Sequence, residues 1–361
     1  MKKVKKQYVI PVFIPHLGCP NDCSFCNQRS ISGKTKMPTK EEVIKIIEDN
    51  LKSMKDENAK KEIAFFGGSF TGIDVEEQKK YLEIANEYVK NKKVSGIRIS
   101  TRPDYIDKET LKRLKKYNVK TIELGVQSTN DYILKRCERG HTFVDVKKAS
   151  KLIRRYRFNL GHQMMVGLPE STKLDEIRSA KELIKLKPKI VRIYPVLVIK
   201  GTKLEKELEE GEYNPLTVSQ AVERCKELLY LFNKKNIQVI RVGLQNTDEI
   251  TDPSCKESEV VAGPYHPAFG QLVDDSIWYD SITDKIKKIN VKAKEVKIKV
   301  NFADMNNAIG HKKSNIKKIK EIYDVDIIVE ADNNIKPGKS EVVIMQTYDE
   351  YMEQVRDKIE I

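Results

Sequence analysis

Short apolar runs alternate with longer, charged segments from residue 8 to about residue 240, and this alternation constrains the fold more than any other feature. Each run is nearly continuous in apolar residues, as expected for strands that are covered on both faces, and the segments between the runs have helical periodicity. The predicted strands are residues 8–14, 62–66, 96–100, 121–126, 159–166, 190–198 and 238–242. Repeated strand–helix units of roughly 30 residues predict an α/β fold with a parallel sheet and right-handed crossovers. About six to seven units suit a barrel, complete or partial, in which ligands collect at the carboxyl ends of the strands.

The remainder of the chain has a different pattern. Residues 245–290 contain several Pro and Gly residues together with aromatic side chains, which predicts a loop-rich extension that returns to the barrel. Residues 291–361 predict a small α+β domain with the element order β-α-α-β-β-α. Its predicted strands are 295–300, 325–329 and 341–345, and its predicted helices are 303–308, 314–323 and 348–359, with Ser314 as an N-cap. We therefore expect three parts, at 1–244, 245–290 and 291–361.

Composition and charge exclude some classes of protein. With 39% hydrophobic and 33% charged residues, the 361-residue chain can bury a sizeable core, which excludes wholesale disorder. Its formal charge of +14 favours polyanionic partners, although a solvated, lysine-rich surface is the alternative. No apolar run approaches the roughly 18–20 residues that span a bilayer, and the basic N-terminal stretch lacks the features of a signal peptide. We expect a cytoplasmic protein.

Three of the six cysteines lie close together, directly after the first predicted strand. Cys19, Cys23 and Cys26 form a C-x3-C-x2-C run, and three thiolates on one tight loop could hold three irons of a cubane cluster. A zinc site would require a fourth ligand at compatible spacing, whereas the other cysteines are scattered. Zinc, a redox dithiol and unliganded structural cysteines remain alternatives.

With Phe25 before its last cysteine, this run resembles the signature of the radical S-adenosylmethionine (SAM) superfamily. Gly67, Gly68 and Ser69 close the second predicted strand, where the superfamily has a Gly-Gly motif for the amino group of SAM. Glycines let the backbone approach a ligand closely, although a tight turn is the alternative. The resemblance implies a (βα)6-type partial TIM-like barrel and a [4Fe–4S] cluster bound by the three cysteines. It also implies that Gly67–Ser69 lie along the methionine part of SAM.

Four further stretches resemble the radical domain of the Elongator catalytic subunit and its prokaryotic relatives. They are residues 100–105 (STRPDY), 123–128 (ELGVQS), 139–142 (RGHT) and 193–202 (IYPVLVIKGT). More distantly, residues 125–142 and 164–169 resemble oxygen-independent coproporphyrinogen oxidases. The Elongator subunit continues into an acetyltransferase domain, and no such segment is recognisable in this sequence, so acetyl-CoA chemistry is not expected.

The same resemblance implies further contacts to SAM. Gln127 and Arg139 would reach its ribose and carboxylate, and Gln163 would contact the ribose. Ser100 takes a position where many relatives carry a ribose- or amine-binding Glu. For Gln127 and Arg139, an internal hydrogen-bonded pair is the alternative.

The basic tail resembles a KH domain, whose Gly-x-x-Gly loop clamps a nucleic-acid backbone. The corresponding loop reads Gly310-His311-Lys312-Lys313 and is followed by Lys317, so a lysine replaces the last glycine. Lysines at the N-terminal end of a helix suit phosphates, and we expect these five residues to bind nucleic acid. A small accessory domain with a lysine-rich face is the alternative.

Together these resemblances imply a radical SAM enzyme that reductively cleaves SAM to a 5′-deoxyadenosyl radical and modifies RNA, with tRNA as the expected substrate. A ferredoxin- or flavodoxin-like protein would supply the electron. One alternative is radical chemistry on a small molecule such as a tetrapyrrole. Another is a non-enzymatic RNA-binding iron–sulfur protein.

Overall fold

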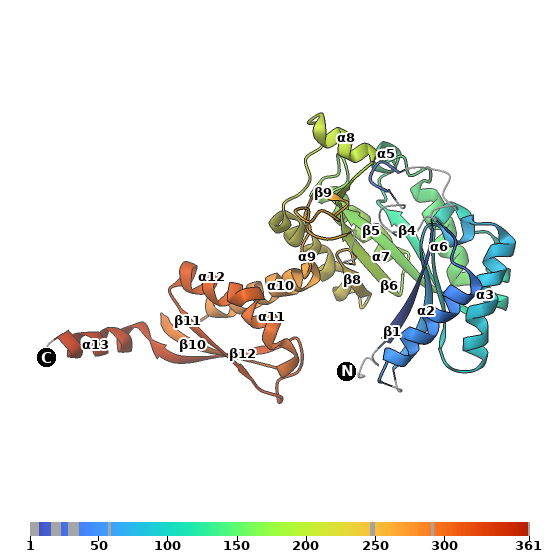
Figure 1. Cartoon of the computed structure of the whole chain (residues 1–361). Helices are drawn as coiled ribbons and strands as arrows, with labels where there is room; N and C mark the ends of the chain where they lie inside the picture. Colours follow the sequence, from blue (N-terminus) through green and yellow to red (C-terminus); the bar gives the residue numbers. More distant parts are fainter. Residues whose placement is uncertain are drawn as a thin grey trace. The chain divides into compact units, whose positions relative to one another are not determined.

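The computed structural model describes residues 7–15, 23–27, 36–56, 59–245, 250–289 and 292–359 (Figure 1). The chain forms two compact units, Met1–Pro267 and Ala268–Ile361. Within the described ranges, no helix has the length and apolar composition needed to cross a bilayer.

A curled parallel sheet is the centre of the first unit, and it confirms the predicted partial TIM-like barrel. Its strand order is β1-β2-β3-β4-β5-β6-β8, and every neighbouring pair is parallel. The strands are β1 (Gln7–Ile14), β2 (Lys60–Gly67), β3 (Gly96–Thr101), β4 (Val119–Gln127), β5 (Asn159–Val166), β6 (Ile190–Pro195) and β8 (Gln238–Val242). The helices of this unit are α2 (Lys40–Ser53), α3 (Val75–Lys90), α4 (Lys108–Lys116), α5 (Asp131–Arg136), α6 (Phe143–Arg155), α7 (Lys173–Lys185), α8 (Lys203–Glu209) and α9 (Val218–Lys234).

The two faces of this sheet differ in chemistry. Ile10, Val12 and Ile14 alternate along β1 with less buried residues, so that one face is apolar. The other face carries Arg98 and Glu123, which the near-continuous apolar runs did not predict. Parallel strands place residues in register on the same face, and this charged face is therefore shared by neighbouring strands.

The predicted strand 190–198 is wrong in its last residues. The chain leaves the large sheet after Pro195, and β7 (Val198–Ile199) pairs antiparallel with β9 (Val260–Ala262) instead. Ile250 and Val260 pack against Leu197 and Ile199, so residues 250–262 join the rest of the first unit through a small apolar cluster.

In the second unit, residues 292–359 have the predicted element order β-α-α-β-β-α. They contain β10 (Ala293–Val300), α11 (Met305–Ile309), α12 (Ser314–Tyr323), β11 (Asp326–Ala331), β12 (Ser340–Thr347) and α13 (Tyr348–Ile359). The central strand β10 pairs parallel with β11 and antiparallel with β12. Val296, Ile298 and Ile319 are buried in its core.

Two predictions about this part of the chain are wrong. The segment 245–290 is not loop-rich throughout, because α10 (Phe269–Ile286) is an 18-residue helix that belongs to the second unit. Its buried residues Trp278, Ile282 and Ile286 recur at helical spacing, but the Pro and Gly residues just before them obscured that pattern. Ser314 is not an N-cap, since α12 begins at Ser314 and the preceding Lys313 has a left-handed backbone.

Candidate active site

One cavity lies at the carboxyl ends of the strands in the first unit. It brings together every described residue of the predicted cluster and SAM sites; Cys19 lies outside the described residues. Sequence reasoning missed three residues of the lining: Thr101, Arg102 and Gly125. The lining residues are Cys23, Phe25, Cys26, Gly67, Gly68, Ser69, Ser100, Thr101, Arg102, Gly125, Gln127, Arg139 and Gln163.

Backbone hydrogen bonds hold the cysteine loop in place. The N–H of Cys26 donates to the carbonyl of Cys23 at 2.9 Å, which closes a tight turn. The N–H of Ser24 donates to the carbonyl of Cys137 at 3.2 Å, and the carbonyl of Ser24 accepts from Leu204 at 2.8 Å. Phe25 is buried in an apolar cluster beside this turn. The two described thiols are therefore anchored at the rim of the cavity.

Gly67 occupies a position where no other residue fits without a shift of the backbone. Its φ is +101°, and an added Cβ would lie 2.3 Å from the carbonyl oxygen of Ile14. The N–H of Gly68 donates to the same carbonyl at 3.0 Å. The hydroxyl of Ser69 accepts from the N–H of Arg102 at 3.2 Å. The glycines thus join β2 to the end of β1 and leave bare backbone along the cavity.

Arg139 and Gln127 both line the cavity, and Oε1 of Gln127 does not accept a hydrogen bond from Arg139. Arg139 donates from Nη2 to the carbonyl of Gly125 at 2.7 Å and from Nη1 to Sγ of Cys23 at 3.3 Å. Gln127 lies at a bulge of β4 with a φ of 68°, and its buried Oε1 has no hydrogen-bond partner among the described residues. The alternative of an internal Arg139–Gln127 pair is therefore absent from the described structure. A strained backbone and an unsatisfied buried oxygen are typical of a ligand site.

Gln163 is held by its amide nitrogen. Nε2 donates to Oγ of Ser100 and to Oε2 of Glu123, both at 3.1 Å. Ser100 thus positions Gln163, a contact that the sequence did not indicate. With its nitrogen fixed in this way, the carbonyl oxygen of Gln163 is oriented as an acceptor.

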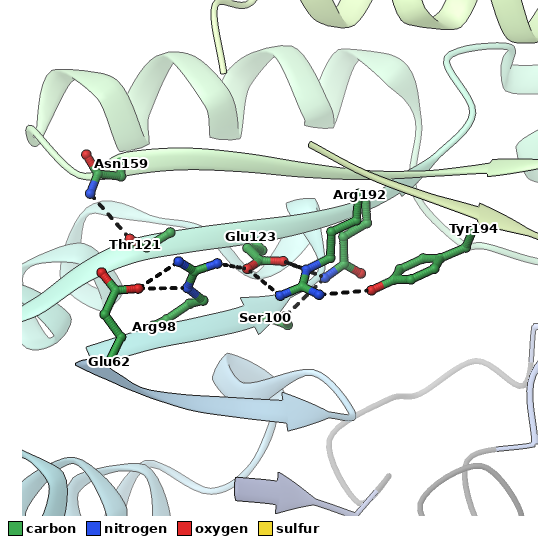
Figure 2. Close-up of polar contacts among 9 residues, drawn as sticks. Glu62, Arg98, Ser100, Thr121, Glu123, Asn159, Arg192 and Tyr194 are labelled. Atoms are coloured by element: carbon green, nitrogen blue, oxygen red, sulfur yellow. Dashed lines mark hydrogen bonds and ion pairs between the residues drawn. The ribbon is translucent and has the colours of Figure 1, made fainter. Parts of the chain in front are cut away.

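A buried ionic network contacts Gln163 through Glu123, and its charged residues are shown in Figure 2. Arg98 bridges two carboxylates, with Nη2 2.7 Å from Oε2 of Glu62 and Nη1 2.8 Å from Oε1 of Glu123. Arg192 donates from Nε to Oε2 of Glu123 at 2.6 Å and from Nη1 to the hydroxyl of Tyr194 at 3.4 Å. The only trace of this network in the sequence is a single charged residue within each of four otherwise apolar runs, which does not indicate how these residues pair.

Glu123 is the centre of this network and is only 1% exposed. Burial by itself would raise the pKa of its carboxyl group, but the positive charges of Arg192 and Arg98 hold that pKa below its usual value. Glu123 therefore stays ionised and orients Gln163 by accepting a hydrogen bond from its amide nitrogen.

Two titratable groups near the cavity are neutral. Burial, together with the positive charges of Arg139 and Arg102, lowers the pKa of His141 to about 4. Burial raises the pKa of the Cys137 thiol to about 12, so this cysteine is an inert thiol rather than a further thiolate near the loop.

The loop 310–313 belongs to the second unit. Gly310 has a φ of +80°, and Lys312 and Lys313 are left-handed, with φ of 52° and 63°. Lys313 thus has a backbone conformation that glycine adopts more readily, and glycine is the residue that a KH loop has at this position. The N–H of His311 donates to the buried carboxylate of Asp275 at 2.7 Å, while Lys312, Lys313 and Lys317 are exposed. The five predicted nucleic-acid contacts therefore lie next to one another.

A larger, open hollow lies elsewhere on the first unit. Its charges are mostly paired: Arg136 contacts Glu170 at 2.8 Å and Glu207 at 2.7 Å. The cavity with the cysteines has the chemically distinctive lining, and we consider it the candidate active site.

The fold and the cavity define a class of protein. The chain matches the radical SAM superfamily over residues 13–184 and the radical SAM C-terminal domain over residues 188–279. It belongs to the radical SAM superfamily and is accordingly an enzyme of that class. The superfamily implies SAM and an iron–sulfur cluster as cofactors.

Within the superfamily, the chain is Elongator-like. It is 36% identical over 236 residues to an uncharacterised protein of Methanocaldococcus jannaschii, a match that covers 61% of this chain and 71% of that one. It is 30% identical over 182 residues to the tRNA uridine(34) acetyltransferase of the same organism, covering 45% of this chain and 34% of the relative. Human Elongator complex protein 3 is 32% identical over 142 residues, covering 38% and 26%. The chain thus spans about a third or less of these last two relatives.

A solved structure has the same fold. Elp3 of Methanocaldococcus infernus, with an N-terminal deletion, superposes with a TM-score of 0.60 at 24% identity, over 78% of this chain and 63% of that one.

The described residues fit the implied cofactors. Cys23 and Cys26 supply thiols, the ligand type that iron–sulfur clusters take. The bare backbone at Gly67 and Gly68, the cation of Arg139 and the unsatisfied oxygen of Gln127 offer contacts to a zwitterionic nucleoside such as SAM.

Proposed function

We propose that this enzyme cleaves SAM reductively and uses the resulting radical to modify tRNA. Cys19, Cys23 and Cys26 would hold a [4Fe–4S] cluster, which supplies the electron that cleaves SAM to methionine and a 5′-deoxyadenosyl radical. A ferredoxin- or flavodoxin-like donor would provide that electron. The observation that carries the proposal is the convergence of two thiols, a bare glycine turn and an unsatisfied amide oxygen on one cavity.

The chain's own residues would bind and orient SAM. The backbone at Gly67 and Gly68 lines the cavity, and its carbonyl groups would accept hydrogen bonds from the amino group. Arg139 pairs with the carboxylate, and such charge-assisted hydrogen bonds are short and strong. Gln127 accepts from a ribose hydroxyl through Oε1, and Gln163 accepts from another through its fixed amide group. Phe25 excludes water from one side of the cavity.

The proposal that the substrate is tRNA has two supports. Relatives in the Elongator branch include tRNA uridine(34) acetyltransferases. The chain also carries a charge of +14, and its KH-like second unit presents Lys312, Lys313 and Lys317 beside Gly310. Exposed lysines in a loop suit the phosphates of RNA. In this proposal the second unit binds the tRNA backbone while the first unit performs the chemistry.

Isotope transfer tests the proposal directly. Protein reconstituted with iron and sulfide without oxygen is mixed with dithionite, SAM and bulk tRNA from cells grown in D₂O. A hydrogen abstracted from tRNA would appear as deuterium in 5′-deoxyadenosine, measured by mass spectrometry, and would be absent with protiated tRNA. Deuterium that appears only with a deuterated small-molecule extract would instead establish the small-molecule alternative.

A further inference from the structure

The charged face of the sheet continues from Gln163, one of the predicted SAM contacts, across β6 to β8. Gln163, Arg192 and Arg241 are in register on β5, β6 and β8, so their side chains leave the same face of the sheet. Neighbouring strands are about 4.8 Å apart, which places the Cα atoms of Gln163 and Arg241 about 10 Å apart. Arg241 is thus two strands away from Gln163, which lines the cavity.

The two arginines differ in how their charge is compensated. Both oxygens of Glu123 accept from Arg192, at 2.6 and 3.3 Å, and its guanidinium also lies 5.0 Å from the ring centroid of Phe66. Glu123 is in turn shared with Arg98. Arg192 is therefore a structural cation whose donors are largely used.

Arg241 has no carboxylate partner among the described residues. Its Nε donates to the carbonyl of Gly243 at 3.1 Å and its Nη2 to the carbonyl of Leu244 at 3.2 Å, and these are neutral acceptors. Burial and the like charge of Arg192 lower the pKa of Arg241, so the cation is disfavoured where it stands. Among the described residues, the network and Arg241 together contain three arginines, Arg98, Arg192 and Arg241, and two carboxylates, Glu62 and Glu123.

Tyr194 lies two residues beyond Arg192 on the same face of β6, next to the strand that carries Arg241, and its hydroxyl accepts from Nη1 of Arg192. We propose that Arg241 and the hydroxyl of Tyr194 form a binding site for an oxyanion of the substrate. The described hydrogen bonds of Arg241 use Nε and Nη2, so Nη1 would donate to the oxyanion, and the oxyanion would compensate the surplus charge. Arg recognises phosphate and carboxylate through paired N–H donors. The identity of the oxyanion as an RNA phosphate rests on the proposed function; a carboxylate of a small-molecule substrate would use the same chemistry.

Chemical labelling with phenylglyoxal, which modifies arginines, tests this site in the reconstituted protein. Labelling of Arg241 is followed by peptide mass spectrometry with tRNA, inorganic phosphate or acetate, and exposed Arg155 on α6 is the internal control. We expect tRNA to slow the labelling of Arg241 at least fivefold while Arg155 stays unchanged. Protection by phosphate or acetate but not by tRNA would keep the oxyanion site and contradict an RNA substrate. Unchanged labelling of Arg241 under all three conditions would overturn the site, even if tRNA binds the protein in a gel-shift assay.

Two variants separate charge from structure. For Arg241→Gln we expect about tenfold weaker tRNA binding and a slope of log K against log salt that is shallower by about 0.9, since one phosphate contact is lost. Arg241→Lys keeps the charge but not the paired carbonyl bonds, and it should retain most of the slope, as should the control Arg155→Gln. Equal losses in Arg241→Lys and Arg241→Gln would show that the carbonyl bonds matter and the charge does not, which would contradict the proposal.

Discussion

Nη1 of Arg139 is 3.3 Å from Sγ of Cys23, so a fixed cation lies next to a cysteine of the predicted cluster. The same guanidinium donates to the carbonyl of Gly125, which holds it at the cavity although residues 23 and 139 are far apart in the sequence. This contact connects the cysteine loop to the residues that we assign to SAM.

Removal of this cation should weaken SAM binding without loss of the cluster. Arg139→Ala removes a charged hydrogen-bond donor, which is worth about 1.5–3 kcal/mol, or roughly 10- to 100-fold in affinity. Equilibrium dialysis with labelled SAM measures the affinity, and iron analysis measures the cluster. Unaltered SAM affinity would assign Arg139 a purely structural role.

The backbone at Gly67 should tolerate no side chain. Gly67→Ala places a Cβ 2.3 Å from the carbonyl of Ile14 and adds left-handed strain, together about 2–4 kcal/mol. Gly211→Ala is the matched control, because its φ is +75° but nothing lies within 4 Å of an added Cβ; it should cost about 1 kcal/mol. Denaturant unfolding of both variants measures the difference. Equal losses would mean that the close approach to Ile14 is not a constraint.

Glu123 should be essential for the stability of the first unit. Glu123→Gln leaves Arg98 and Arg192 buried without their shared carboxylate, and breaking a buried ion pair costs about 3–5 kcal/mol. Denaturant unfolding measures this loss, with Glu109→Gln in the exposed pair with Lys112 as a control that should change little. A stable Glu123→Gln variant would show that the network is dispensable.

Two buried histidines should make the protein sensitive to mild acid. The pKa values of His141 and His162 fall from 6.5 to about 4 and about 3, mainly through burial, so both rings are neutral in the folded state. Between pH 6.5 and 4 the unfolded chain binds protons that the folded chain does not, and stability decreases by up to about 1.4 kcal/mol per pH unit for each histidine. The contribution of these two histidines to the free energy of unfolding should therefore be constant above pH 6.5 and decrease as the pH falls below 6.5.

A histidine variant checks the origin of this dependence. His162→Gln removes one of the two groups and should reduce the slope below pH 6.5 by about half, whatever its effect on stability at pH 7. An unchanged slope would mean that other groups cause the acid sensitivity.

Lys313 should combine backbone strain with a role in RNA binding. Its φ of 63° is unfavourable for a residue with a side chain, so Lys313→Gly should raise the melting temperature of the second unit's transition. The same change removes a charge and should weaken tRNA binding, and Lys313→Glu should weaken it further. Calorimetry and gel-shift titration measure the two effects. Tighter tRNA binding by Lys313→Gly would show that the loop binds through its backbone alone.

Features that depend on nearby residues could be predicted from the sequence. The strands, the cysteine run and the Gly67–Gly68 turn are local patterns, and the structure places the described residues of these motifs on one cavity. Thr101, Arg102 and Gly125 were missed because they line the cavity only through the register of β3 and β4.

Features that depend on partners far apart in the sequence could not be predicted. The contacts of Glu123 join β3, β5 and β6, and Arg98 extends the network to Glu62 on β2, so that no single run of residues shows them. The helix α10 was missed for another reason: its apolar residues pack against β10 and α12, whereas the segment just before it contains Gly263, Pro264 and Pro267.

The most direct test of the central claim is the production of 5′-deoxyadenosine from SAM. Wild-type protein, Cys23→Ala and Cys255→Ala are reconstituted with iron and sulfide, reduced with dithionite and mixed with SAM without oxygen; Cys255 is the control because it is exposed in a loop. We predict 5′-deoxyadenosine from the wild type and from Cys255→Ala, and none from Cys23→Ala. Undiminished production by Cys23→Ala, or no production by wild-type protein with a full iron content, would contradict this account.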